Sequence, residues 1–125
     1  SGLAAAERLF ARPQIPTAIF ASNDDMAAAV IAAAHRLHLD VPADVSVCGF
    51  DDTAIASTIW PELTTIRQPI RQMACSAIEL LSRRMRARSE GESCEPAYLT
   101  LGYELIRRQS DAAPTLAVRG GRPAA

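Results

Sequence analysis

Residues 17–25 read TAIFASNDD, and this stretch decides the fold. Its first five residues are apolar or β-branched and follow Pro16, as in a short strand that is buried on both faces. Polar residues follow at once, because Ser22 or Asn23 can cap a helix and Asp24 and Asp25 place negative charge in its first turn. The stretch therefore predicts a strand that leads directly into a helix. Apolar residues then recur at helical spacing, at Met26, Val30, Ala33 and Leu37.

A second strand follows this helix. The helix is expected to end before Pro42, and residues 45–50 (VSVCGF) are rich in β-branched residues. Strand, helix and strand within about 35 residues make a βαβ unit, in which a right-handed crossover joins two parallel strands. The sequence therefore predicts an α/β fold, with a parallel sheet and flanking helices.

The rest of the chain supplies further elements around this unit. Apolar spacing predicts a short helix over residues 3–10. From Asp111 onward, Ala, Pro, Gly and Arg follow one another without a period. We therefore expect one domain over residues 1–110 and a disordered tail over residues 111–125. Within the domain, residues 53–58 fit one or two helical turns, residues 64–67 a third strand, residues 70–86 a long helix with an apolar stripe, and residues 99–108 a last strand.

Composition and charge exclude several classes of protein. The 125 residues are 49% hydrophobic, which can supply one core, but no stretch reaches the roughly 18 apolar residues of a membrane span. A formal net charge of -1 gives no overall attraction to nucleic acid. Cys48, Cys75 and Cys94 form no metal-binding motif and indicate a reducing compartment. We expect no membrane span, no secretory signal, no metal and no cofactor.

Asn23 and Asp51 form a candidate binding site. Each follows a predicted parallel strand, at the edge where α/β proteins bind ligands. The amide can donate and accept, and the carboxylate can accept two hydrogen bonds, which suits the hydroxyls of a sugar or the edge of a purine. Capping explains either residue equally well, because Asn and Asp are favoured at helix N-termini. Spacing alone leaves both interpretations open.

Enzymatic interpretations have less support. The sequence contains no G-x-G-x-x-G, G-x-x-x-x-G-K-[ST], G-x-S-x-G or H-E-x-x-H. His35 and His38 lack a third ligand at metal-binding spacing. Asp25, Asp51 and Asp52 suggest a receiver-like acidic pocket, but that site also needs a lysine, and all 13 basic residues are arginine. We therefore expect a non-enzymatic protein with no catalytic residue.

Small and aromatic side chains offer a candidate interface. The helix after Asn23 carries an alanine-rich face, which would let another helix approach closely. Trp60 suits either packing or an interface. This face is a candidate dimer surface.

Three segments together resemble the LacI/GalR family of bacterial transcriptional regulators in order and spacing. They are residues 16–24 (PTAIFASND), 41–52 (VPADVSVCGFDD) and 63–69 (LTTIRQP). Residues 104–110 (ELIRRQS) are similar to the closing strand of the family, so the resemblance runs from about Ser1 to Ser110. In that family an N-terminal helix-turn-helix headpiece binds operator DNA. A two-lobed, periplasmic-binding-protein-like core senses a small effector between its lobes.

The resemblance implies what this chain does. It would be an incomplete C-terminal lobe of the core in a cytoplasmic regulator, reaching operator DNA only through the headpiece that it lacks. Asn23 and Asp51 match positions that contact the effector, a sugar or related polar metabolite, and Ile70 matches an apolar wall. A periplasmic sugar-binding protein of an ABC transporter is the alternative. Family dimer surfaces match residues 27–36 and 55–60, which gives Ala27, Ala28, Ile31, Ile55, Ile59 and Trp60 as homodimer contacts.

Two residues depart from the family pattern, His38 and Gly102, and Gly102 replaces a usual proline in the approach to the final strand. His38 stands where the helix usually closes with glycine, and histidine tolerates a left-handed backbone better than most residues. The helix at residues 70–86 would pack against the missing lobe, so its apolar stripe would be uncovered. We expect it to swing out, pack on another copy or swap between chains, because burying each apolar side chain is favourable by about 1.5–3 kcal/mol.

Overall fold

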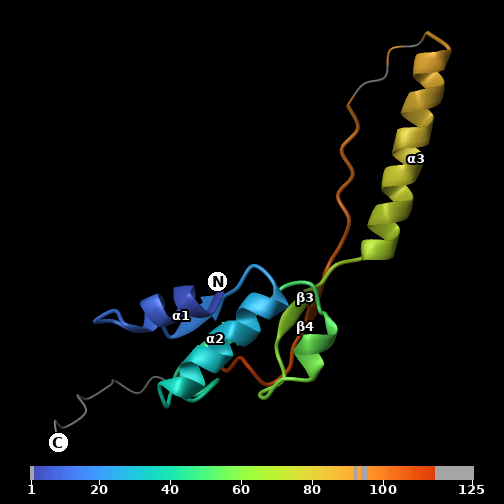
Figure 1. Cartoon of the computed structure of the whole chain (residues 1–125). Coiled ribbons are helices and arrows are strands. Elements are labelled where there is room, and N and C mark those ends of the chain that lie inside the picture. Colours follow the sequence, from blue (N-terminus) through green and yellow to red (C-terminus); the bar gives the residue numbers. More distant parts are fainter. Residues whose placement is uncertain (1, 92, 94–95, 115–125) are drawn as a thin grey trace, which may run out of the picture.

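The computed structural model describes residues 2–91, 93 and 96–114 (Figure 1). Every helix and strand that the sequence predicts is present, although the strands are shorter than expected. The predicted disordered tail, residues 111–125, lies mostly outside the described residues. In chain order the elements are α1 (Gly2–Phe10), β1 (Ala18–Phe20), α2 (Asp24–Arg36), β2 (Ser46–Cys48), the 3-10 helix η1 (Ala54–Ser57), β3 (Thr65–Arg67), α3 (Ile70–Ser89) and β4 (Glu104–Ile106).

The predicted βαβ unit is confirmed. β1 and β2 are parallel, with Phe20 opposite Cys48, and α2 connects them. The helix ends as expected, since His38 adopts a φ of 56°. The backbone N–H of Leu39 then donates to the carbonyl oxygen of Ala34 at 2.9 Å, which satisfies one of the last carbonyls of the helix.

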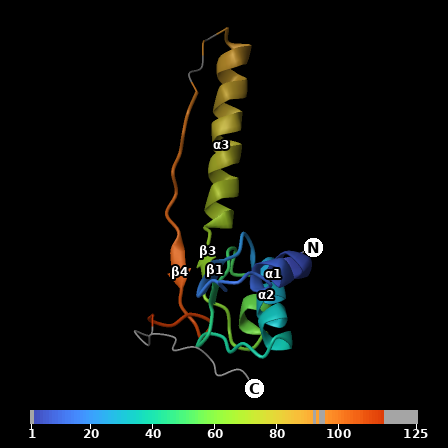
Figure 2. The ribbon, with the colours of Figure 1, turned by 90° about the vertical axis from the view of Figure 1, so that its left-hand side faces the viewer.

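The sheet continues from β2 to β3 and β4. A parallel bridge joins Cys48 to Thr64, so the first three strands are parallel, as predicted. β4 pairs with β3 in the antiparallel direction, with Arg67 opposite Glu104. The last strand is shorter than residues 99–108, because the chain before β4 runs beside α3 and away from the sheet (Figure 2).

The core lies between the sheet and the pair of helices α1 and α2. Val45, Val47 and Leu63 are fully buried. α1 packs along α2 and buries Ala6 and Phe10 in the same cluster. These helices cover one face of the sheet and hold its strand ends in place.

The other face of β1 is open, which corrects the expectation of a strand buried on both faces. Ile19 packs against the core, whereas Phe20 is 63% exposed. Consecutive residues of a strand point to opposite faces. In the described part of the chain no helix covers the face that carries Phe20, so this face stays accessible (Figure 1).

α3 projects away from this body (Figures 1 and 2). None of its residues is buried. The helix continues to Ser89, beyond the predicted end, and stops before Gly91, which has a φ of 75°. The expected outward position is therefore observed, while packing on another copy stays a prediction. The exposed apolar side chains of α3 include Ile70, Met73, Ile78, Leu81 and Met85.

Among the described residues no helix combines the length and the apolar character needed to cross a bilayer.

Candidate functional site

The candidate site lies at the carboxyl ends of the three parallel strands. Phe20 and Cys48 are opposite each other in the sheet. Asn23 and Asp51 each follow three residues later, in the segments just beyond the ends of β1 and β2. Gln68 follows β3 directly and supplies a third polar group at this edge.

Asn23 is the N-cap of α2. Its side-chain Oδ1 accepts a hydrogen bond from the backbone N–H of Met26 at 2.8 Å. The side-chain Nδ2 of Asn23 donates to no other group that the structure describes. The side chain is half-buried. One end of the amide therefore caps the helix, while the other end is available to donate to a ligand.

Asp51 points to Gln68. The side-chain Nε2 of Gln68 donates to Asp51 Oδ1 at 2.6 Å, and the backbone N–H of Asp51 donates to the carbonyl oxygen of Ile66 at 2.8 Å. Asp51 has a φ of 112°, which costs free energy for a residue with a side chain and is typical of functional sites. Its second oxygen, Oδ2, accepts no bond within the described ranges. Asp51 therefore keeps one acceptor for a ligand.

Gln68 was not predicted as a site residue, although the sequence contains a usable signal for it. The rule that selected Asn23 and Asp51 is that polar residues follow the carboxyl ends of parallel strands. Gln68 satisfies the same rule after β3, between Arg67 and Pro69. The structure brings it into contact with Asp51 and makes it part of the candidate site.

Asp24, one residue after Asn23, has a structural role. Its side chain is fully buried and accepts hydrogen bonds from Thr53 N at 2.6 Å, Thr53 Oγ1 at 3.0 Å and Thr65 Oγ1 at 2.6 Å. These contacts join the start of α2 to η1 and β3. Asp24 thus connects the segments that carry the polar edge through buried hydrogen bonds.

Asp52 forms an ion cluster beside Asp51. Its two oxygens lie 2.6 Å from Arg67 Nη2 and 2.6 Å from Arg108 Nη2, and its side chain is 7% exposed. Burial alone would raise the pKa of Asp52, but hydrogen bonds and positive charge from Arg108 and Arg67 outweigh burial and lower this pKa below its usual value. Asp52 therefore stays ionised and faces arginines, not a ligand.

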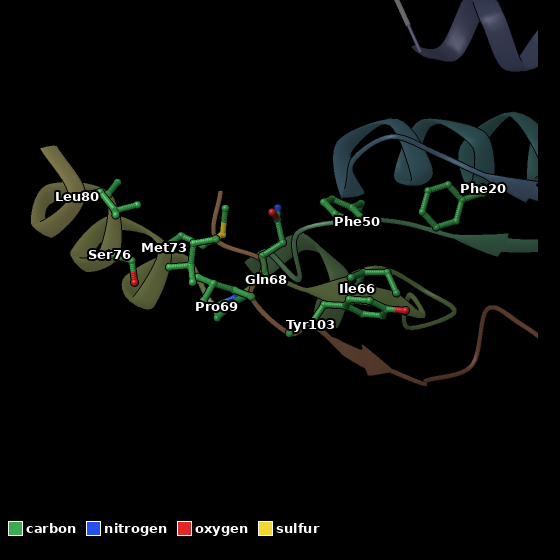
Figure 3. A pocket seen from close by; sticks show the side chains of 13 residues that line it. Phe20, Phe50, Ile66, Gln68, Pro69, Met73, Ser76, Leu80 and Tyr103 are labelled. Carbon is green, nitrogen blue, oxygen red and sulfur yellow. The ribbon is translucent and has the colours of Figure 1, made fainter. Parts of the chain in front are cut away.

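An open groove of about 590 Å³ adjoins the polar edge (Figure 3). Phe20 and Phe50 line one end of it, with their ring centroids 6.4 Å apart and an interplanar angle of 69°. Gln68 lies between these rings and α3, which contributes Met73 and Leu80 (Figure 3). Gln68 is the residue of the polar edge that lines the groove, whereas Asn23 and Asp51 are not among its lining residues.

Ile70 lies next to this groove but does not line it. It is 58% exposed and lines a second, shallower hollow that shares Gln68 and Pro69 with the first. The groove receives its apolar wall from other residues of α3 and from Ile66. The role of Ile70 as a wall of the site stays a prediction.

The predicted dimer contacts divide into buried and accessible residues. Ala27 and Ile31 are 0% and 3% exposed, so they belong to the core and cannot present a surface. This face of α2 was predicted to contact a partner, whereas α1 and η1 of the same chain pack against α2. Trp60 is 73% exposed. The contacts that remain as predictions are Trp60 and the half-buried Ala28, Ile55 and Ile59.

The described cysteines do not form a reactive or metal-binding site. Burial, followed by the negative charges of Asp111 and Asp24, raises the pKa of the Cys48 thiol above its usual range. Cys75 is exposed on α3, and Cys94 lies outside the described residues. Within the described ranges no three potential ligands gather as a metal site.

Known proteins share this fold and sequence pattern. The sequence profile of the periplasmic binding protein-like domain matches residues 1–110. Catabolite control protein A of Priestia megaterium is 34% identical over 110 residues, which cover 88% of this chain and 32% of that protein. The chain thus spans about a third of the length of this relative.

Two solved structures extend the similarity to three dimensions. The complex of the transcriptional regulator CelR with cellobiose matches with a TM-score of 0.74 at 34% identity, over 88% of this chain and 32% of that chain. The lac repressor dimer bound to operator and an anti-inducer matches with a TM-score of 0.74 at 31% identity, over 90% of this chain and 37% of that chain. The chain belongs to the family of periplasmic binding protein-like domains that LacI/GalR-type transcriptional regulators contain.

Proposed function

We propose that residues 1–110 form part of the effector-sensing core of a LacI/GalR-type regulator of transcription. In this proposal the domain binds a small polar effector, a sugar or a related metabolite, without chemical conversion. The observation that carries the proposal is the row of polar groups at three successive strand ends, Asn23, Asp51 and Gln68, beside an aromatic pair.

The free atoms at this edge suit a polyhydroxy ligand. Asn23 Nδ2 is available as a donor and Asp51 Oδ2 as an acceptor, and a hydroxyl group can satisfy both kinds of partner. The Gln68–Asp51 bond holds the carboxylate in one orientation. Phe20 and Phe50 offer apolar surface for the less polar face of a sugar ring. CelR, one of the structural relatives, is solved in complex with cellobiose.

The proposed signal is a shift between two arrangements of the protein. The groove lies where α3 leaves the body, so it borders both the sheet and α3. A ligand that binds one arrangement of these parts more tightly shifts the population toward it. Operator DNA would be bound elsewhere in the regulator, since this chain has a formal net charge of -1.

α3 and the surface around Trp60 would contact other parts of the regulator. The apolar stripe of α3 would pack against the other lobe of the regulator, because an uncovered stripe of this size is unfavourable in water. The homodimer would use the surface around Ile55, Ile59 and Trp60. The lac repressor, a structural relative, is solved as a dimer on its operator. The proposed location is the cytoplasm, where operator DNA is.

A periplasmic sugar-binding protein of a transporter is the second candidate, because its fold would be similar. The relatives favour the regulator, since catabolite control protein A, CelR and the lac repressor are named for regulation. An electrophoretic mobility-shift assay distinguishes the regulator from the transporter component. It uses the complete protein that the gene encodes, which is called the full chain below. A regulator binds the promoter region beside its gene and responds to the ligand, whereas a transporter component binds sugar but no DNA.

The site is tested by calorimetric titration of the same full chain with cellobiose and D-ribose as probes. Asn23→Asp keeps an oxygen for the helix cap but removes the amide donor, so we expect weaker binding at nearly unchanged stability. Asp51→Ala removes the acceptor, and each lost contact is expected to weaken binding by about 1–3 kcal/mol. Asp25→Ala, in the same turn of α2 but exposed, is the control. Unchanged affinity in both site variants would refute the assignment.

A further inference from the structure

Asp52 joins the loop after β2 to β3, through Arg67, and to the segment that follows β4, through Arg108. Arg67 Nε donates to Asp52 Oδ2 at 2.7 Å, and Arg108 Nη2 donates to Asp52 Oδ1 at 2.6 Å. Arg108 also donates from Nη1 to the carbonyl oxygen of Leu63 at 2.7 Å. Both oxygens of a nearly buried carboxylate are thus occupied by arginines, and we call Asp52, Arg67 and Arg108 the crossover cluster.

The cluster lies at the two points where the chain passes between the body and α3. Arg67 is the last residue of β3 before the chain leaves, and Glu104 is the first residue of β4 after it returns. These two residues are opposite each other in the antiparallel pair, and Arg67 Nη1 lies 3.3 Å from Glu104 Oε2. Arg67 therefore links the loop that carries Asp51 to the outgoing crossing and, through Glu104, to the returning one.

The crossover cluster and the polar edge use neighbouring residues of the same two segments. Asp51 and Asp52 both have positive φ values, 112° and 54°. The two carboxylates diverge and contact consecutive residues of the crossing: Asp51 accepts from Gln68, and Asp52 accepts from Arg67. The two pairs are therefore adjacent along both segments of the backbone.

We propose that Asp52 is a positioning residue of the effector site, which acts through Arg67 and Arg108 to hold Asp51 and Gln68 in contact at the crossing to α3. This inference rests on the proposed function of the edge. Asp52 itself offers the effector no free oxygen, because its two oxygens are bonded to arginines. The other charged groups facing the cluster are Glu104 and Glu62, which balance Arg67 and Arg108.

A first test needs no ligand and follows the side-chain amide of Gln68 by NMR in the full chain. Its two amide signals are identified by their loss in Gln68→Glu. Asp52→Asn should move these signals and speed their hydrogen exchange, because the Gln68–Asp51 bond loosens. Glu7→Gln removes a different carboxylate–arginine pair, with Arg36, between α1 and α2, and should leave them unchanged. Unmoved signals in Asp52→Asn overturn the inference.

Arg67→Gln gives a second measurement where Asp52→Asn fails to fold. Arg67 is 52% exposed, and its removal leaves the Asp52–Arg108 pair in place. The Gln68 signals should move in this variant as well. Signals that stay at the wild-type position in a folded Arg67→Gln protein overturn the inference.

The second test measures affinity for cellobiose or D-ribose, whichever the wild-type chain binds. Asp52→Asn should weaken binding about fivefold to tenfold, and should add little to Gln68→Ala in a double-mutant cycle. The control Glu7→Gln should leave the dissociation constant unchanged. A stability loss without an affinity change in Asp52→Asn overturns the inference. If Asp51→Ala and Gln68→Ala also leave affinity unchanged, the proposed function fails separately.

Discussion

Replacing Asp24 with alanine is expected to lower the free energy of unfolding by about 3–5 kcal/mol. The Asp24 side chain is fully buried and accepts three hydrogen bonds, two from Thr53 and one from Thr65. Thr65 is also fully buried, so its hydroxyl would lose its partner without access to water. Thr53 is exposed, so water can replace part of what it loses.

The magnitude follows from these three contacts. An unsatisfied buried donor costs about 1–3 kcal/mol, and a hydrogen bond to a charged group contributes about 1.5–3 kcal/mol. Loss of a negative charge from the first turn of α2 adds about 0.3–1 kcal/mol. Because water can replace part of the hydrogen bonding that Thr53 loses, the total loss in the free energy of unfolding stays below the sum of these contributions. The loss is large against the about 5–15 kcal/mol that stabilises a typical domain.

Urea denaturation of the full chain, followed by far-UV circular dichroism, measures this loss. Asp25→Ala is the matched control, because it removes an exposed carboxylate from the same helical turn. Its cost should stay below about 1 kcal/mol. In a Thr65→Val background, Asp24→Ala should cost less, because the buried hydroxyl is already gone. Equal costs for Asp24→Ala and Asp25→Ala would refute the reasoning.

Three further predictions concern pH and backbone conformation. The pKa of Asp52 in the folded protein is lower than its unfolded value of about 3.9. The stability that Asp52 contributes is therefore complete above the unfolded pKa and is lost as the pH falls through the folded pKa. Asp52→Asn should flatten the acid side of a plot of urea midpoint against pH, and parallel plots for the variant and the wild type would contradict this. Gly49→Ala would place a Cβ against the buried Asp24 Oδ1 and 2.7 Å from Leu63 Cδ2, and should cost about 1–3 kcal/mol. Gly102→Ala, with no atom within 4 Å of the new Cβ, should cost under about 0.5 kcal/mol in the same denaturation assay. Similar costs for the two variants would show that the close approach at Gly49 is not limiting. His38→Gly should raise the free energy of unfolding by up to about 1 kcal/mol, because glycine adopts the φ of 56° without side-chain strain, and a lower thermal midpoint would count against this.

Local patterns in the sequence were sufficient to predict most of the elements. The polar cluster after β1 predicted the start of α2, because a cap and first-turn carboxylates act within one helical turn. The equal spacing of Asn23 and Asp51 from their strands predicted that both lie at one edge, and the parallel register places the ends of those two strands side by side. The tolerance of His38 for a left-handed backbone was also predictable, since it depends on one residue.

Contacts between distant segments could not be read in the same way. The sequence did not reveal that Asp24 bonds to Thr53 and Thr65, and these residues lie far along the chain. It also assigned Ala27 to a partner, although α1 and η1 pack on its helix. Periodicity indicates that a face is buried, but it does not indicate which segment covers that face.

The sequence by itself determined the βαβ unit, the helix caps and the strand-end positions of Asn23 and Asp51, because these features depend on neighbouring residues. Only the tertiary structure decided that Asp51 contacts Gln68, that Asp52 is held by Arg67 and Arg108, and that Phe20 faces an open groove. The physical reason is that pairing of β2 with β3 and of β3 with β4 is non-local. Their register determines which of several similar polar side chains meet at the edge of the sheet.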